Sequence, residues 1–351
     1  MKKDFLATCV MKNAIVLFTL MCVFTLMISC SSESDELDSK LPDEPNKVAE
    51  MIDVKLGFGG DPISISENPL TRAEDKKKVY GINVYYREGS SSYQHYAYGL
   101  FDNIGDMKIS LISKYNYKFE CTIVQDDKDE LYVDNNGSYS YPFYRKYGYN
   151  TKLENKFIVS TTSSDYLSEM KYGQSRVKNG SSYKETSYPR TDRLYGELTN
   201  YTPTDGGTAV INMKRTVFGA KFVINPPADG TLELGMSPFF SKTISSTDAT
   251  QTIDEVIYTF SDVYACWQQQ EDYTRDFTLN LTWKRANGAT QYFSKTITMK
   301  RNVMTTVNIS VSGSTGDSSV GFNEENTQMS SATVNATFNG GSSNDNNVDP
   351  Q

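Results

Sequence analysis

Hydrophobic residues occupy every second position in the stretch from Ile52 to Phe58. A period of two is typical of a β-strand that buries one face and exposes the other. The pattern therefore predicts a strand whose inward side chains are Ile52, Val54, Leu56 and Phe58.

The same alternation recurs in short segments along the rest of the first half, most clearly from Tyr115 to Val124. There we expect one face in a core and the other in water. Two polar stretches interrupt the series, at residues 126–155 and 160–190. Both are interpreted as excursions from a sheet, and the second contains Tyr166 to Tyr172, where a short helix is expected.

The second half contains the strongest hairpin signal of the chain. Alternating residues from Phe277 to Trp283 are followed by Asn287-Gly288, which tolerates the positive φ of a tight turn, and by a second alternating run from Tyr292 to Met299. Hairpins without crossover helices predict an all-β protein made of antiparallel β-sandwiches. The polar run YTPTDGG suggests a division into domains at residues 51–203 and 204–312.

Residues 313–351 form a polar tail rich in Ser, Gly and Asn. Within it, residues 332–338 repeat the opening pattern with smaller side chains, at Ala332, Val334, Ala336 and Phe338. Two readings stay open at this point. The two segments are either unrelated strands or interchangeable ones.

The N-terminus has the features of a targeting signal. A basic start, at Met1 or Met11, precedes an apolar run to Ile28 that is too short for a stable membrane span. The run ends in Leu26-Met27-Ile28-Ser29-Cys30, which resembles a bacterial lipobox and implies a signal peptide over residues 1–30 with lipid on Cys30. Residues 31–50 are then a polar, acidic tether.

Composition narrows the function classes. The chain of 351 residues carries a formal net charge of −8, which argues against nucleic acid as a partner. Cys121 and Cys266 are expected to be buried thiols rather than a disulfide. The single histidine, His95, is expected on a surface or loop, and common zinc, redox, hydrolase and phosphate-loop motifs are missing. We therefore expect no enzyme activity, no cofactor and no metal.

A possible cleavage site follows the first strand. Pro69-Leu70-Thr71-Arg72-Ala73 places an arginine in an extended, polar setting that a trypsin-like protease could enter. A strand followed by a place to sever it suggests a removable part of the fold.

The chain resembles the fimbrillin family of Bacteroidetes, the subunits of type V pili. The resemblance rests on the Cys30 lipobox, residues 68–73 leading into 79–85, the 97–102 strand, and Met213-Lys214-Arg215 before residues 218–224. It implies two transthyretin-like antiparallel β-sandwich domains in tandem and an outer-membrane lipoprotein precursor that becomes part of a cell-surface fimbria.

The resemblance also implies an assembly mechanism. An arginine-specific protease would cut between Arg72 and Ala73, removing residues 51–72 and with them the strand that carries Ile52, Val54, Leu56 and Phe58. Another pilus subunit would then donate a strand to the vacated groove. By the same resemblance, Ala332, Val334, Ala336 and Phe338 form the candidate donor strand.

The alternative hypothesis is a surface lipoprotein that binds glycans. Tyrosine and tryptophan rings can form platforms for sugars, and aromatic residues crowd one polar region. The candidate platform consists of Tyr139, Tyr141, Phe143, Tyr144, Tyr147 and Tyr149, with contributions from Trp267 and Trp283. Trp283 lies on the apolar side of its strand and is expected in the core.

Overall fold

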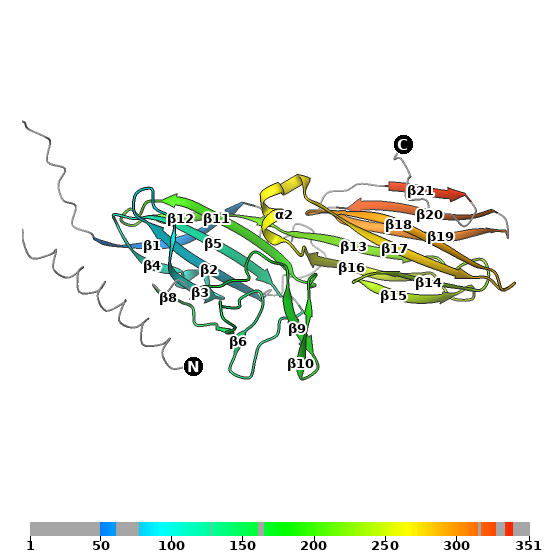
Figure 1. Cartoon of the computed structure of the whole chain (residues 1–351), viewed down its shortest axis with the longest axis horizontal. Helices are drawn as coiled ribbons and strands as arrows, with labels where there is room; N and C mark the ends of the chain where they lie inside the picture. Colours follow the sequence, from blue (N-terminus) through cyan, green and yellow to red (C-terminus); the bar gives the residue numbers. More distant parts are fainter. Residues whose placement is uncertain are drawn as a thin grey trace, which may run out of the picture. The chain divides into compact units, whose positions relative to one another are not determined.

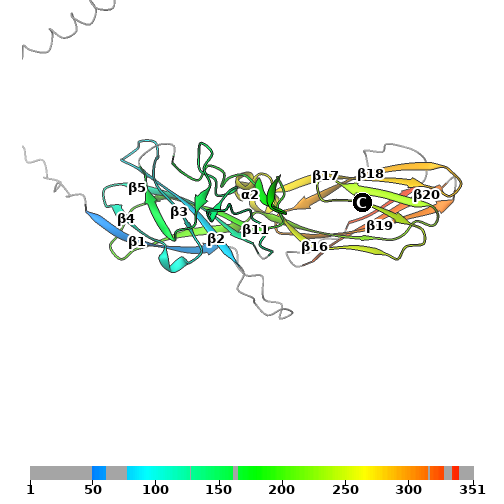
Figure 2. The same cartoon turned by 90° about the horizontal axis from the view of Figure 1, so that it is seen from below.

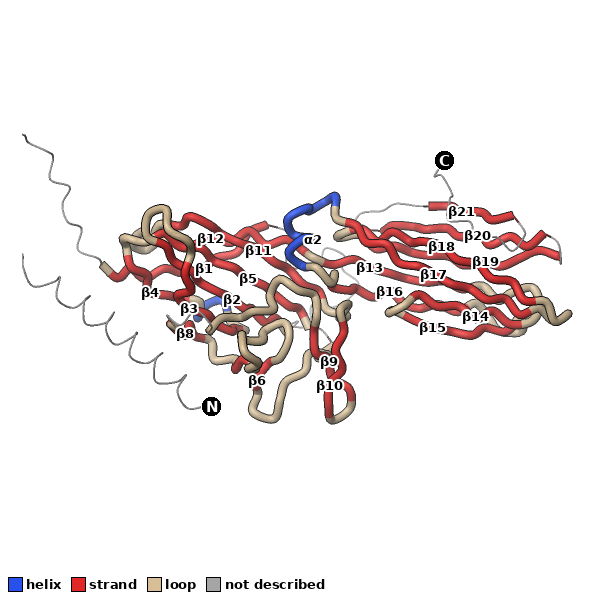
Figure 3. Tube along the Cα trace, viewed as in Figure 1, coloured by secondary structure: helices blue, strands red, loops and turns tan. Residues whose placement is uncertain are grey.

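The structure is a computed structural model that describes residues 50–60, 77–126, 128–160, 165–314, 317–327 and 334–339. Strands make up most of this part of the chain, as Figure 3 shows, and the helix α2 (Val263–Gln269) is seven residues long. Among the described residues, no helix combines the length and hydrophobicity that crossing a bilayer requires. The all-β prediction is confirmed.

The first sandwich is one sheet folded over its own core. Its strand order is β4-β1-β12-β11-β5-β2-β3-β8, and β12 is bonded to β1 along most of its length and to β11 only at its end (Figure 1). The strands are β1 (Met51–Gly60), β2 (Lys78–Arg87), β3 (Gln94–Phe101), β4 (Lys108–Ile112), β5 (Asn116–Gln125), β8 (Lys156–Val159), β11 (Asp192–Tyr201) and β12 (Thr208–Arg215). One buried cluster takes side chains from β4, β1 and β12 on one side and from β11, β5, β2 and β3 on the other.

The second sandwich has two separate sheets, with strand orders β16-β13-β19-β20-β21 and β15-β14-β17-β18. Figure 2 shows β17 and β18 on the opposite side from β16 and β19. The strands are β13 (Val217–Ile224), β14 (Thr231–Met236), β15 (Phe240–Ser245), β16 (Gln251–Thr259), β17 (Thr274–Lys284), β18 (Thr290–Lys300), β19 (Met304–Ser314), β20 (Asp317–Thr327) and β21 (Val334–Asn339). The predicted hairpin is confirmed as β17 and β18, joined in register from Thr274↔Lys300 to Lys284↔Thr290.

The two sandwiches repeat one topology. Taken in chain order, β1, β2, β3, β4, β5, β11 and β12 correspond to β13, β14, β15, β16, β17, β18 and β19. Five pairings agree in partner and direction. The first strand pairs parallel with the last. Four pairings are antiparallel: the first strand with the fourth, the second with the third, the second with the fifth, and the fifth with the sixth. In each sandwich the first strand therefore lies between the fourth and the last.

The parallel pairing of first and last strands is a feature that hairpin signals do not reveal. A parallel pair needs a long connection between its two strands. In each sandwich that connection is the rest of the domain, because five strands separate β1 from β12 and β13 from β19 in this correspondence. Strand direction here follows from the whole topology rather than from any local turn.

The first sandwich also extends further along the chain than the predicted boundary at residues 203 and 204. Thr208–Arg215 forms β12, which bonds to β1 and β11, whereas β13 begins the second sandwich at Val217. The YTPTDGG run is thus the turn between β11 and β12. A polar, glycine-containing turn within a domain has the same composition as a linker between domains.

The outward face of the first sandwich is covered, which corrects the expectation that it lies in water. Glu120 and Thr122 on β5 are 5 % and 0 % exposed. The chain between β5 and β11 lies over this face and carries the short strands β6 (Ser138–Tyr139), β7 (Thr151–Lys152), β9 (Ser175–Asn179) and β10 (Ser182–Thr186). Alternation predicts which side chains share a face but not whether another segment covers them.

Polar side chains of the sheet hold this cover in place. Asn83 both donates to the carbonyl of Leu167 (3.0 Å) and accepts from its backbone N–H (2.9 Å). The buried Arg193 donates to the carbonyls of Met170 (2.7 Å) and Tyr172 (2.6 Å). Residues 165–173, called the covering segment below, are therefore bound through their backbone. They form turns, which corrects the expectation of a short helix at residues 166–172.

Candidate functional site: the first strand of the first sandwich

The inward side chains of β1 complete the core of the first sandwich. Val54 is 0 % and Leu56 4 % exposed, and Ile52 and Phe58 pack against the same cluster. The ring of Phe58 stacks on that of Tyr80 across the core, with centroids 5.7 Å apart. Complete burial of one aliphatic side chain of this size contributes about 1.5–3 kcal/mol, so β1 is a substantial part of this core.

The backbone of β1 joins two strands that do not otherwise meet. Its first half, Met51–Lys55, pairs antiparallel with β4, and its second half, Lys55–Gly60, pairs parallel with β12. Bonds outside the regular ladder extend the junction, from Leu56 N–H to the Met107 carbonyl (3.0 Å) and from Ser113 N–H to the Glu50 carbonyl (2.8 Å). β1 is thus an internal strand of its layer.

Both neighbours depend on β1 for their pairing. Within the described residues, β4 bonds to no other strand, and the Thr208–Met213 part of β12 is paired only with β1. Loss of β1 would leave two unpaired strand edges that face each other across an apolar groove. Unpaired edges readily accept another strand, because their N–H and C=O groups lack partners.

In the second sandwich, the strand equivalent to β1 is joined to described strands on both sides in the chain. Its first strand, β13, pairs antiparallel with β16 and parallel with β19, and Phe218, Ala220, Phe222 and Ile224 are buried. β13 follows β12 after the single residue Thr216, and residues 225–230 connect it to β14. It cannot be cut away without dividing the folded protein.

The connection from β1 onward is different. Residues 61–77 join β1 to β2, and this stretch contains Arg72 and Ala73. A cut there would separate β1 from the rest of the chain without breaking any other strand that the structure describes. Arg72, Ala73 and the lipidation candidate Cys30 lie outside the described residues, so their roles stay predictions.

The candidate donor strand lies at the edge of the second sandwich. Val334, Ala336 and Phe338 belong to β21, which pairs antiparallel with β20, and Ala332 lies outside the described residues. β20, which the sequence did not reveal, pairs with β19 from Met304↔Thr327 to Ser314↔Asp317. β21 is thus the edge strand of the sheet β16-β13-β19-β20-β21. If β21 detached, β20 would still pair with β19.

The predicted aromatic platform is not assembled as one surface. Tyr139 and Phe143 are 6 % and 0 % exposed and belong to a buried cluster. Trp283 is buried as predicted, and its indole N–H donates to the Asp229 carbonyl. The other candidates are divided: Tyr147 and Tyr149 are exposed, Trp267 packs against Tyr195, and Tyr141 stacks on Tyr144. Aromatic crowding in the sequence reflects, in part, the core beneath the cover.

His95 is buried rather than exposed, which corrects the expectation of a surface histidine. It lies in β3, where burial lowers the pKa of its imidazole, and its Nδ1 is 3.3 Å from the Ser160 carbonyl. The prediction of two buried free thiols is confirmed for Cys121 and Cys266, and burial raises the pKa of both. The described ranges contain no group of three or more His, Cys, Asp or Glu residues arranged for a metal ion.

No protein-family model and no curated protein matches the chain. Among solved structures it is similar to a candidate cell adhesion protein from Bacteroides eggerthii, with 7 % identity, coverage of 77 % of this chain and 88 % of that one, and a TM-score of 0.36. The fimbrial anchor protein Mfa2 from Porphyromonas gingivalis gives 11 % identity, 82 % and 97 % coverage, and a TM-score of 0.32. A fimbrial assembly protein from Parabacteroides distasonis gives 9 % identity, 82 % and 100 % coverage, and a TM-score of 0.30. Similarity this low assigns neither a family nor a function.

Proposed function

We propose that the chain is a non-enzymatic structural subunit of a cell-surface fimbria that contributes to adhesion and assembles by strand exchange. In this proposal β1 is a temporary first strand. An arginine-specific protease cuts after Arg72, β1 leaves, and a strand of another subunit enters between β4 and β12. Lipid on Cys30 anchors the precursor to the outer membrane before that cut.

One observation carries the proposal. The two sandwiches share a topology, yet only in the first does the central first strand have no described strand before it in the chain, so that one cut within residues 61–77 would release it. A core that contains Val54 and Leu56 would not tolerate an empty slot, since burial of such side chains supplies much of its stability. A released β1 therefore demands a replacement.

The intact chain should remain monomeric for the same reason. While β1 is in place, the edges of β4 and β12 are paired and cannot accept another strand. Proteolysis thus controls when the acceptor groove becomes available.

The test is to treat the purified precursor with an arginine-specific protease and to follow its size and N-terminal sequence. We expect one new N-terminus at Ala73, followed by polymers, and no polymers from an Arg72→Ala variant under the same treatment. Arg87→Ala is the matched control, because it removes a described arginine downstream of the proposed cut. Polymerisation that is equal in the wild type and the Arg72→Ala variant would refute the proposal.

A further inference from the structure

A cavity of about 520 Å³ lies on the outward face of the first sandwich, between the sheet and the covering segment. Its volume is in the range of small-ligand sites. It is lined by Tyr85 of β2, Gln94 and His95 of β3, Glu120 of β5, and Tyr166 and Lys171 of the covering segment, among others. Strand exchange uses the opposite layer of this sandwich, so assembly does not account for the cavity.

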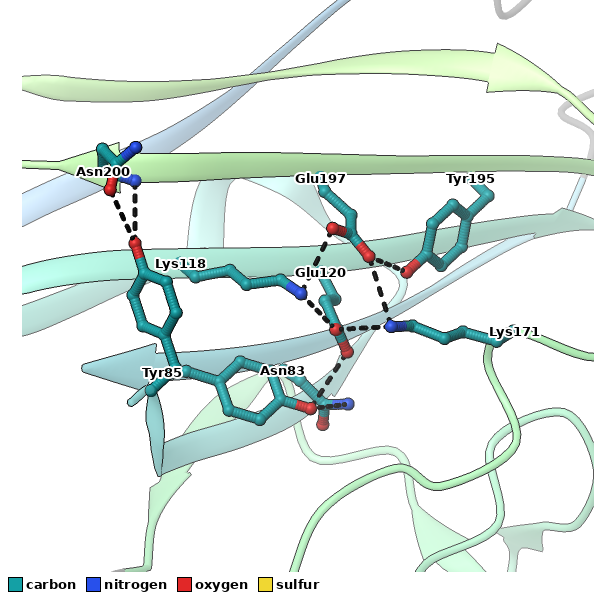
Figure 4. A network of polar contacts seen from close by, with 9 residues as sticks. Asn83, Tyr85, Lys118, Glu120, Lys171, Tyr195, Glu197 and Asn200 are labelled. Carbon is teal, nitrogen blue, oxygen red and sulfur yellow. Dashed lines mark hydrogen bonds and ion pairs between the residues drawn. The ribbon is translucent and has the colours of Figure 1, made fainter. Parts of the chain in front are cut away.

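The charged groups at its base are balanced. Glu120 and Glu197 are direct neighbours across β5 and β11, and Lys118 and Lys171 each contact both carboxylates at 2.8–3.4 Å (Figure 4). The hydroxyl of Tyr85 donates to Glu120 Oε2 at 2.9 Å. A charged ligand would have to disrupt this set of two acids and two bases, so the site favours an uncharged one.

Aromatic rings form the walls above this base. His95 is 5.4 Å from the Tyr85 ring and 5.7 Å from the Tyr166 ring, centroid to centroid. Tyr172, also at the cavity, is 56 % exposed. Tyrosine offers a flat apolar face together with a polar edge, and both can contact a ring that has C–H groups on its faces and hydroxyls on its rim.

Two polar side chains at the cavity can form further hydrogen bonds. His95 is 6 % exposed and its Nε2 is buried without a hydrogen bond, while its Nδ1 is placed to donate to the Ser160 carbonyl. Nε2 is then an unpaired acceptor, and an unpaired buried acceptor costs stability that a donating hydroxyl would restore. Gln94 is exposed, and its carbonyl oxygen already accepts from the Tyr86 hydroxyl, which leaves the amide N–H groups to donate.

We propose that this cavity binds a neutral saccharide, with a sugar ring against Tyr166 and Tyr172 and its hydroxyl groups directed to His95 and Gln94. A neutral saccharide is uncharged, which matches the balanced base. Its apolar ring face matches the aromatic walls, and its hydroxyls match the hydrogen-bonding groups of His95 and Gln94. The site would give the subunit a ligand of its own and does not require strand exchange.

The experiment is to apply the purified uncleaved chain to an array of neutral, sialylated and sulfated oligosaccharides and to titrate the best neutral ligand calorimetrically. Tyr172→Ala and Tyr166→Ala should each weaken binding about three- to tenfold, the value of one aromatic contact. Tyr292→Ala, which removes a tyrosine that is 65 % exposed and does not line the cavity, should leave binding unchanged.

The proposal fails if the array shows no binding, if acidic glycans bind in preference to neutral ones, or if Tyr172→Ala binds like the wild type. Because Tyr172 is exposed, that variant should fold even if Tyr166→Ala does not. The uncleaved chain is used throughout, so a negative result leaves the assembly mechanism untouched, and failure of assembly leaves the binding site untouched.

Discussion

At the scale of single residues, the inward side chains of β1 have a double role, because they stabilise the precursor and shape the groove that a donor would fill. Leu56→Ala should therefore lower the free energy of unfolding of the uncleaved chain by about 2–5 kcal/mol. Lys55→Ala, on the exposed side of the same strand, is the control. Equal denaturant midpoints for the two variants would show that β1 does not contribute to the core.

The Glu120 carboxylate predicts a specific pH dependence. Burial alone would raise its pKa, but Lys118 and Lys171 outweigh burial and hold the pKa below the ordinary value. A carboxylate with a lowered pKa stabilises the folded state above its unfolded pKa, and that stability is lost as the pH falls below about 4.

Glu120→Gln should consequently lose about 1–3 kcal/mol at neutral pH, because it leaves two partly exposed ammonium groups with one carboxylate. When the pH is lowered from neutral to below about 4, the free energy of unfolding should fall less for Glu120→Gln than for the wild type, because the variant has no carboxylate at this position to protonate. Denaturant titrations at a series of pH values measure both effects. Parallel curves for the wild type and the variant would contradict the assigned role of this carboxylate.

At the scale of elements, alternation predicted the inward face of β1 and both strands of the β17–β18 hairpin. It could not predict that β1 pairs in parallel with β12, because side-chain period fixes a face and not a neighbour. It also could not predict that Glu120 and His95 are buried, since the covering segment is held by hydrogen bonds to its backbone rather than by an apolar pattern.

The C-terminal strands offer a prediction at the same scale. Deletion of residues 328–351 removes β21 but keeps β20, which protects the edge of β19. If β21 is the donor, the shortened chain should be cut by the protease without forming polymers, while its thermal unfolding stays close to that of the full chain. Size-exclusion chromatography distinguishes the outcomes, and polymers of unchanged length would exclude β21 as the donor.

At the scale of the whole molecule, the repeated topology explains why one sandwich can be opened and the other cannot. In the second sandwich the first strand is continuous with the fold on both sides, whereas in the first it precedes everything else that the structure describes beyond Glu50. The correspondence between the sandwiches was not visible in the sequence, because their inward residues differ. β1 and β13 hold the same position in the strand order, but β1 packs Ile52, Val54 and Leu56 against the core where β13 packs Phe218, Ala220 and Phe222.

The central claim is that β1 must leave before subunits can join, and a reversible crosslink tests it directly. Asp53 of β1 lies opposite Ser110 of β4, and their side chains are already in contact. Backbone hydrogen bonds join the 50/113 and 56/107 pairs, and because bonded pairs alternate with non-bonded ones in an antiparallel ladder, Asp53 and Ser110 form a non-hydrogen-bonded pair. Such pairs have Cα atoms about 4.5 Å apart, within reach of a disulfide.

We predict that an Asp53→Cys, Ser110→Cys chain, oxidised and then cut after Arg72, stays monomeric until a reductant is added, and then polymerises like the wild type. The single variant Asp53→Cys should polymerise after the cut with or without reductant. Polymers that form at the wild-type rate while the disulfide is intact would contradict the account.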